Sequence, residues 1–151
     1  PLGRFRLVWD DVVYQPGEIK VVAYDGKGNV AAEQTARTAG KPYALKTEVS
    51  RNSLSGRDDL AYVKVTVVDA AGTAVPYASN LVKIKVEGAG SFKAVANGDP
   101  TCLESLQKNE MHLFSGSLSF IVEGGDIDGN IAISVSAKGL KTAKTNIINK
   151  L

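Results

Sequence analysis

The stretch that decides the fold is Val63-Lys64-Val65-Thr66-Val67-Val68-Asp69-Ala70-Ala71-Gly72. Valine alternates with a polar residue through its first half, which puts the valines on one face of a strand and Lys64 and Thr66 on the other. The run then enters a turn, where Gly72 tolerates a positive φ and Asp69 accepts hydrogen bonds from backbone N–H groups. This pattern predicts a strand with one buried face, followed by a tight turn.

The same alternation with a period of two recurs along the chain. It is seen at Phe5/Leu7/Trp9, Val82/Ile84/Val86, Leu118/Phe120/Val122 and Ile131/Ile133/Val135. Turn residues separate the runs roughly every 8 to 12 residues, the spacing of a β-sandwich. Helical periodicity is weak, and residues 101–108 are the best candidate for a short helix because Leu103 and Leu106 stand three apart. The sequence predicts an all-β protein.

A linker is expected at Thr38-Ala39-Gly40-Lys41-Pro42, where small residues, a glycine and a proline gather. The strands that we expect after it are 44–50, 61–69, 81–87, 91–96, 114–122, 131–138 and 141–148. They suffice for one immunoglobulin-like sandwich in residues 41–151. Three strands are expected before it, at 4–10, 18–25 and 30–37, which is too few to close a sandwich. Residues 1–40 are therefore interpreted as the C-terminal part of a truncated second immunoglobulin-like domain, and the chain as a piece of a longer protein.

The composition argues against two classes of partner. The 151 residues include 18 basic and 16 acidic side chains, mixed along the chain, for a net charge of +2. Nucleic-acid binding is not expected, because it calls for a clustered basic face. No apolar run approaches the length of a membrane-spanning helix, so no membrane partner is expected either. Trp9 shares its predicted face with Phe5 and Leu7, which favours burial in the core.

Residue types used in catalysis are present but not in catalytic patterns. The pairs Asp10-Asp11 and Asp58-Asp59 are sequence neighbours, which point to opposite faces of a strand and cannot converge on one substrate atom. Cys102 stands next to Leu103 and no Cys-His pair is evident, which favours a small residue in or near the core over a nucleophile. His112 is the only histidine and is interpreted as a partly exposed loop residue. No catalytic residue and no cofactor are predicted.

Two weaker patterns concern ligands. Asp126-Ile127-Asp128-Gly129-Asn130 begins like a calcium loop, but Ile131 stands where glycine is needed and Ala137 where the bidentate glutamate should be. We interpret it as a hairpin tip and predict no metal site. Tyr43 and Tyr77 each lie beside a proline near the linker or on a loop. They are the candidates for contact with a sugar, which aromatic rings can stack upon.

Two stretches carry a family resemblance. The first is Trp9-Asp10-Asp11-Val12-Val13-Tyr14-Gln15-Pro16-Gly17-Glu18-Ile19-Lys20-Val21-Val22-Ala23-Tyr24, closing at residues 38–42. It resembles the immunoglobulin-like domain that follows the catalytic barrel in family 2 glycoside hydrolases of the β-galactosidase type from Bacteroides-like bacteria. The second is residues 63–76, then Val95-Ala96-Asn97-Gly98-Asp99-Pro100, then Phe114-Ser115-Gly116. It is similar to the additional C-terminal immunoglobulin-like domain of the same enzymes.

The resemblance implies a function that the residues alone do not. It implies a non-catalytic accessory segment of an enzyme that hydrolyses β-galactosides or related glycosides, with the catalytic barrel of the parent chain as partner. It also implies a periplasmic or extracellular location. A carbohydrate-binding module and a bacterial surface adhesion or spacer domain are the alternatives. The apolar faces expected in residues 1–40 suggest a homodimer formed through that segment, because exposed apolar side chains and a strand edge favour association.

Overall fold

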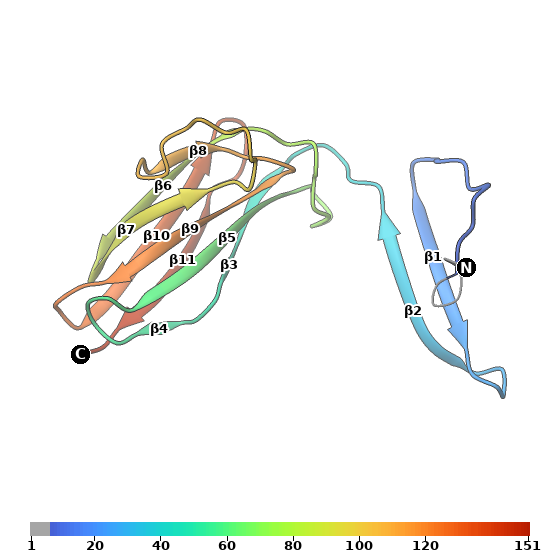
Figure 1. Ribbon diagram of the computed structural model, residues 1–151, viewed down its shortest axis with the longest axis horizontal. Coiled ribbons are helices and arrows are strands. Elements are labelled where there is room, and N and C mark those ends of the chain that lie inside the picture. Colours follow the sequence, from blue (N-terminus) through green and yellow to red (C-terminus); the bar gives the residue numbers. More distant parts are fainter. Residues whose placement is uncertain (1–6) are drawn as a thin grey trace. The chain divides into compact units, whose positions relative to one another are not determined.

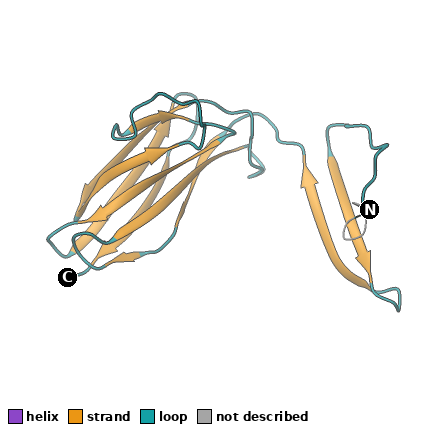
Figure 2. Cartoon of the chain, in the orientation of Figure 1, coloured by secondary structure: helices purple, strands orange, loops and turns teal. Residues whose placement is uncertain are grey.

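The computed structural model describes residues 7–151 and divides the chain into two compact units, one ending at Thr38 and the other spanning Ala39–Leu151. Within the described range every regular element is a strand (Figure 2). The predicted all-β class is confirmed. The candidate helix at residues 101–108 is wrong: that segment consists of turns and bends. No helix in residues 7–151 has the length and apolar character needed to cross a membrane.

The first unit contains one antiparallel hairpin, made of β1 (Glu18–Tyr24) and β2 (Val30–Arg37). Asp25 shapes the connecting turn by accepting hydrogen bonds from the N–H groups of Lys27 and Asn29, at 2.8 and 2.9 Å. The register places charged side chains on one face, where Lys20 pairs with Glu33 at 2.7 Å. The opposite face carries Ile19, Val21, Ala23, Ala32 and Ala36, together with the polar Gln34, and all six are exposed. The hairpin therefore has one ion-paired face and one apolar face.

The prediction of a strand at residues 4–10 is wrong for the residues that the structure describes. Residues 7–10 form no strand, and residues 4–6 lie outside the described part. Trp9 is 59% exposed, so the expected core burial of its side chain is also wrong. The physical reason is that an alternating pattern becomes a strand only where a partner edge supplies hydrogen bonds, and residues 7–10 pair with no described strand.

The second unit is a sandwich of two sheets (Figure 1). One sheet has the order β3-β5-β9-β7, formed by Ala44–Val49, Leu60–Val68, Ser117–Gly124 and Gly90–Ala96. The other has the order β4-β11-β10-β6-β8, formed by Ser53–Leu54, Ala143–Asn149, Gly129–Ala137, Leu81–Gly88 and Glu110–His112. Without β4 and β8, this is the four-plus-three arrangement of an immunoglobulin sandwich. The predicted immunoglobulin-like fold is confirmed.

The alternating residues face each other between the two sheets. Val63, Val65 and Val67 on β5 are fully buried, as are Phe120 on β9 and Ile131 on β10. The outward partner Lys64 is exposed, as the period of two requires. Phe120 also contacts Phe92 of β7, with ring centroids 6.4 Å apart. The core thus follows the pattern that the sequence shows.

Candidate functional site

Asp69 organises the start of the second unit. It ends β5, is 8% exposed, and its carboxylate accepts hydrogen bonds from the N–H groups of Gly40 (2.8 Å), Thr73 (2.8 Å) and Ala71 (2.9 Å). These bonds hold the pKa of Asp69 below its ordinary value, and the bond from Gly40 has the largest effect. The role predicted for Asp69 in its turn is confirmed. The bond to Gly40 adds a link across 29 positions of sequence, which stabilises the loop entering β3.

The two tyrosines proposed as sugar contacts lie in the same region of the second unit. The hydroxyl of Tyr77 donates to the carbonyl oxygen of Gly40 at 2.8 Å. The ring of Tyr43 has the Nζ of Lys141 over it, 4.5 Å from the centroid. The hydroxyl of Tyr77 and one face of the Tyr43 ring are thus already in contact with other groups of the chain. Sugar contact by Tyr43 or Tyr77 stays a prediction.

The cysteine and the histidine have separate partners. Cys102 is half-buried against the core and its Sγ accepts from the side-chain amide of Asn97 at 3.6 Å. The Nδ1 of His112 lies 2.9 Å from Oε1 of Glu104, at the exposed surface. The interpretation of Cys102 as a residue in or near the core is confirmed, and His112 is partly exposed as expected, although it ends the short strand β8 rather than lying in a loop.

The adjacent carboxylates and the calcium-like stretch also have ordinary structural roles. Asp10 and Asp11 lie in an exposed turn. Asp59 accepts from the N–H of Ser55 at 2.9 Å and from Arg51 at 2.8 Å. The predicted hairpin tip at residues 126–130 is wrong: residues 125–128 connect β9 to β10, which lie in different sheets, and Gly129 and Asn130 begin β10. In the described part of the chain, no group of three His, Cys, Asp or Glu side chains is placed to hold a metal ion.

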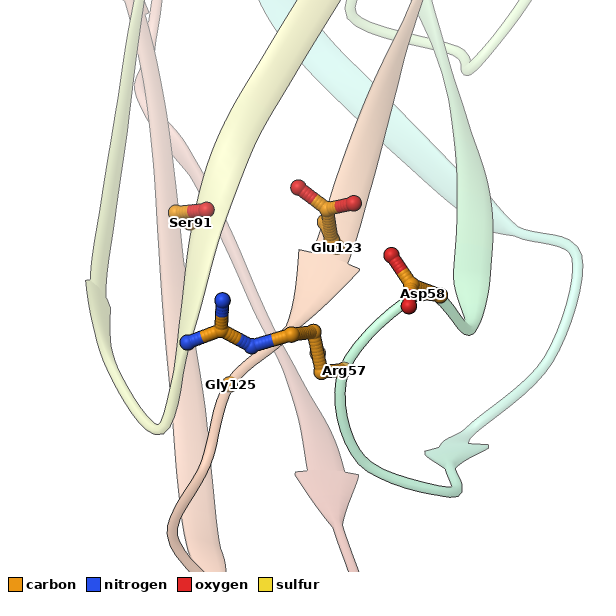
Figure 3. A pocket seen from close by; sticks show the side chains of 6 residues that line it. Arg57, Asp58, Ser91, Glu123 and Gly125 are labelled. Carbon is orange, nitrogen blue, oxygen red and sulfur yellow. The ribbon is translucent and has the colours of Figure 1, made fainter.

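A polar hollow of about 280 Å³ lies at one end of the β3-β5-β9-β7 sheet (Figure 3). It is lined by Arg57, Asp58, Ser91, Glu123, Gly124 and Gly125. Arg57 and Asp58 come from the loop before β5, Ser91 from β7, and Glu123 from the end of β9 (Figure 3). Three segments that are distant in sequence therefore meet in one place.

Ion pairs fix two of the lining side chains. The guanidinium of Arg57 binds Asp126 through Nη2 and through Nε, the latter at 2.7 Å from Oδ1. The hydrogen bond from Arg57 lowers the pKa of Asp126, and the carboxylate in turn raises the pKa of Arg57. Glu123 pairs with Lys93. Two cations and three carboxylates gather here, so the hollow is nearly neutral and offers both donors and acceptors of hydrogen bonds.

Asn149 fixes the backbone that surrounds the hollow. Its side chain is fully buried near the end of β11, accepts from the N–H of Gly56 at 3.1 Å, and donates to the carbonyls of Gly125 (3.0 Å) and Ile127 (2.9 Å). Gly124 also donates its N–H to the carbonyl of Asp59 at 3.0 Å. The approach is so close that a Cβ on Gly124 would lie 2.2 Å from the oxygen of Gly56. The walls are thus held in place by the chain itself.

Sequence reasoning missed the hollow and Asn149. The lining residues are separated by more than 30 positions and include no motif. The available signals were Gly124-Gly125 at the end of a strand pattern and Asn149, which stands two residues after Ile147 and therefore on the same face of the strand. An amide on an otherwise apolar face is a candidate for a buried hydrogen-bonding residue, because a buried polar group needs partners.

Comparison with known proteins defines the class. Residues 45–146 match the family described as glycoside hydrolase family 2 C-terminal domain 5, and residues 2–32 match a domain of unknown function, DUF4982. The first match covers well over half of the chain, so the chain belongs to that family. It is a domain of the kind that ends family 2 glycoside hydrolases, and the predicted resemblance is confirmed.

Individual relatives agree with this assignment. The chain is 31% identical over 147 residues to the β-galactosidase BoGH2A of Bacteroides ovatus, covering 97% of this chain and 17% of that protein. A family 2 glycosyl hydrolase from Bacteroides cellulosilyticus superposes with a TM-score of 0.87 at 29% identity, over 93% of this chain and 18% of the other. A β-glycosidase from Bacteroides vulgatus gives a TM-score of 0.85 at 25% identity, over 91% and 18%. The chain spans less than a fifth of the length of these relatives.

Proposed function

We propose that this chain is a non-catalytic accessory segment of a glycoside hydrolase that acts on β-galactosides or related glycosides, and that it supports the folded enzyme. The observation that carries the proposal is the match of residues 45–146 to a C-terminal family of these enzymes, together with coverage of only 17% of a β-galactosidase relative. The catalytic barrel of the parent chain is the proposed partner.

The state of the carboxyl groups supports a non-catalytic role. Family 2 hydrolysis needs two carboxyl groups about 5 Å apart, one of them a general acid with a raised pKa. Among the described carboxyl groups whose pKa departs clearly from the ordinary value, every one is lowered: Asp25, Glu48, Asp59, Asp69, Asp99 and Asp126. Hydrogen bonds and ion pairs stabilise their charged forms, which is the opposite of what a general acid requires.

Two measurements test the proposal. The purified chain should not hydrolyse 4-nitrophenyl β-galactoside above the rate of a mock purification. In the parent enzyme, deletion of residues 39–151 should shorten the half-life of activity on heating while leaving kcat/KM nearly unchanged. Turnover by the isolated chain, or a deletion that lowers kcat/KM without affecting heat inactivation, would contradict the proposal.

Two further proposals concern the association of the chain and the cellular location of the parent enzyme. We propose that residues 1–40 mediate homodimer contact through the exposed apolar face of the hairpin, a role supported by the exposure of Ile19 and Val21. We also propose that the parent enzyme is periplasmic or extracellular, which the family resemblance implies. Fractionation of the source cells, with activity assayed in each fraction, tests the location.

A further inference from the structure

The hollow at the end of the β3-β5-β9-β7 sheet has no part in the support role. Its most telling group is Asp58, an exposed residue whose carboxylate forms no hydrogen bond with a side chain of residues 7–151 and whose charge acts on the neighbouring Arg57. Asp58 also has a φ of 68°, a left-handed conformation that few residues other than glycine adopt. Together these features present an unpaired hydrogen-bond acceptor at the hollow.

The other lining groups add both donors and acceptors of hydrogen bonds. Arg57 uses Nε and Nη2 on Asp126, which leaves Nη1 without a partner among the described residues. Glu123 uses Oε1 on Lys93, and its Oε2 has no described partner. Ser91 contributes a hydroxyl, which both donates and accepts. A ligand that suits this set carries several neighbouring groups that each donate and accept, which is the property of adjacent hydroxyls.

An apolar strip lies beside these polar groups. The register of β5 and β9 places Tyr62 opposite Ile121 and Leu60 opposite Glu123, all on the outer face of the sheet. Tyr62 is 54% exposed. One strand step of two residues, about 7 Å, separates the pair Tyr62–Ile121 from the pair that contains Glu123. The surface therefore places an exposed tyrosine one strand step from Glu123, on the same face of the sheet as that lining residue but outside the lining of the hollow itself.

These features favour one class of ligand. A pyranose presents hydroxyls at its edge and apolar C–H groups on its face, so it matches a polar hollow next to a tyrosine. Ligand pockets begin at about 300 Å³, and the hollow, at about 280 Å³, lies just below that range, which limits its ligand to a single ring. A metal ion is a poor match, since the described residues hold no group of three metal-ligating side chains.

We propose that this hollow is a binding site for a single neutral saccharide ring, with Arg57, Asp58 and Glu123 holding its hydroxyls and Tyr62 contacting its face. The walls are already locked by Asn149, which stabilises the loop 55–59 and the segment after β9 before any ligand arrives. Such preorganisation lowers the cost of binding. The proposal goes beyond the support role, because an accessory segment needs no ligand of its own.

The test follows the backbone amides of Ser91, Gly124 and Gly125 by NMR in the full 151-residue chain. The probes are methyl β-galactopyranoside, sorbitol as a polyol without a ring, and calcium chloride. We expect saturable shifts of these three amides with the pyranoside alone. Two variants remove predicted contacts: Tyr62→Ala, and Asp58→Gly, which accepts the left-handed backbone and therefore preserves folding. Each should weaken binding at least about tenfold. Tyr24→Ala is the matched control, an exposed tyrosine on β1 and outside the hollow, and should bind as the wild type.

Each opposite result overturns the proposal. These are the absence of saturable shifts at the three amides, equal shifts with sorbitol, a response to calcium that replaces the response to sugar, or loss of binding in Tyr24→Ala but not in Tyr62→Ala. The support role is judged separately by hydrolysis and heat inactivation, so failure of sugar binding leaves it standing.

Discussion

Asn149 shows how one side chain can stabilise several loops. It is fully buried and satisfies three backbone groups, those of Gly56, Gly125 and Ile127. Asn149→Ala should lower the free energy of unfolding by about 2–4 kcal/mol, because three buried polar groups lose their partner. The matched control is Asn146→Ala, an exposed asparagine on the same strand, which should change it by less than about 0.5 kcal/mol. Urea unfolding measures both, and equal effects would contradict the role of Asn149.

Asp69 predicts how stability depends on pH. Its pKa is lowered in the folded chain, first by the N–H of Gly40, whereas the unfolded chain returns to about 3.9. The unfolded state therefore takes up the proton first as the pH falls, so the stabilisation from Asp69 is complete above about pH 5 and is lost as the pH falls through the folded pKa. Asp69→Asn should unfold more easily at neutral pH and show a flatter loss of stability in acid.

Urea midpoints from pH 7 down to the acid limit measure this dependence. Asp10→Asn, an exposed carboxylate of the first unit, is the control and should keep the wild-type slope. An unchanged acid slope in Asp69→Asn would show that other carboxylates dominate the pH dependence.

At the scale of elements, the strands with long alternation were predictable and the short ones were not. Seven expected strands after the linker match β3, β5, β6, β7, β9, β10 and β11 to within a few residues. β4 and β8 have two and three residues, too few for an alternating pattern to appear. The pattern at residues 7–10 failed for the converse reason, since alternation cannot report whether a partner strand is present.

The connection between β9 and β10 carries a prediction about calcium. Asp126 is held by Arg57, and Oδ1 of Asp128 accepts the N–H of Leu151 at 2.6 Å. Both carboxylates are engaged within the chain, and the loop lacks the later ligands of a calcium site. Millimolar calcium should therefore leave the Tm unchanged in the wild type and in Asp128→Ala. A rise in the wild-type Tm that Asp128→Ala removes would establish a metal site.

At the scale of the whole molecule, the hairpin of the first unit predicts association. Ile19 and Val21 are 53% and 43% exposed, and burying a large apolar side chain is worth roughly 1.5–3 kcal/mol. Residues 1–151 should form a dimer in light scattering, or show little hydrogen-exchange protection in the hairpin, whereas residues 39–151 should be monomeric and well protected. Val21→Lys should abolish the dimer, while Thr35→Lys, on the ion-paired face, should not.

A strict monomer whose hairpin is as protected as the sandwich would contradict this expectation.

The cover of the hairpin's apolar face and the existence of the hollow could not be predicted from the sequence, and the reason is the same for both. Alternation within one strand reports which side chains share a face. It does not report what covers that face, nor which distant loops meet, because both depend on contacts between segments far apart in sequence.

The pairing of the short strand β4 with the last strand β11 has a mechanical consequence. The two run parallel, with hydrogen bonds from Ile148 to Asn52 (3.0 Å) and from Lys150 to Leu54 (2.9 Å), and Ala44 also lies parallel to Lys141. When the second unit is stretched between Ala39 and Leu151, parallel strands are drawn past each other along their lengths. The bonds are then loaded together in shear rather than opened one after another. The sandwich therefore resists tension where the short strand β4 pairs with the last strand, β11.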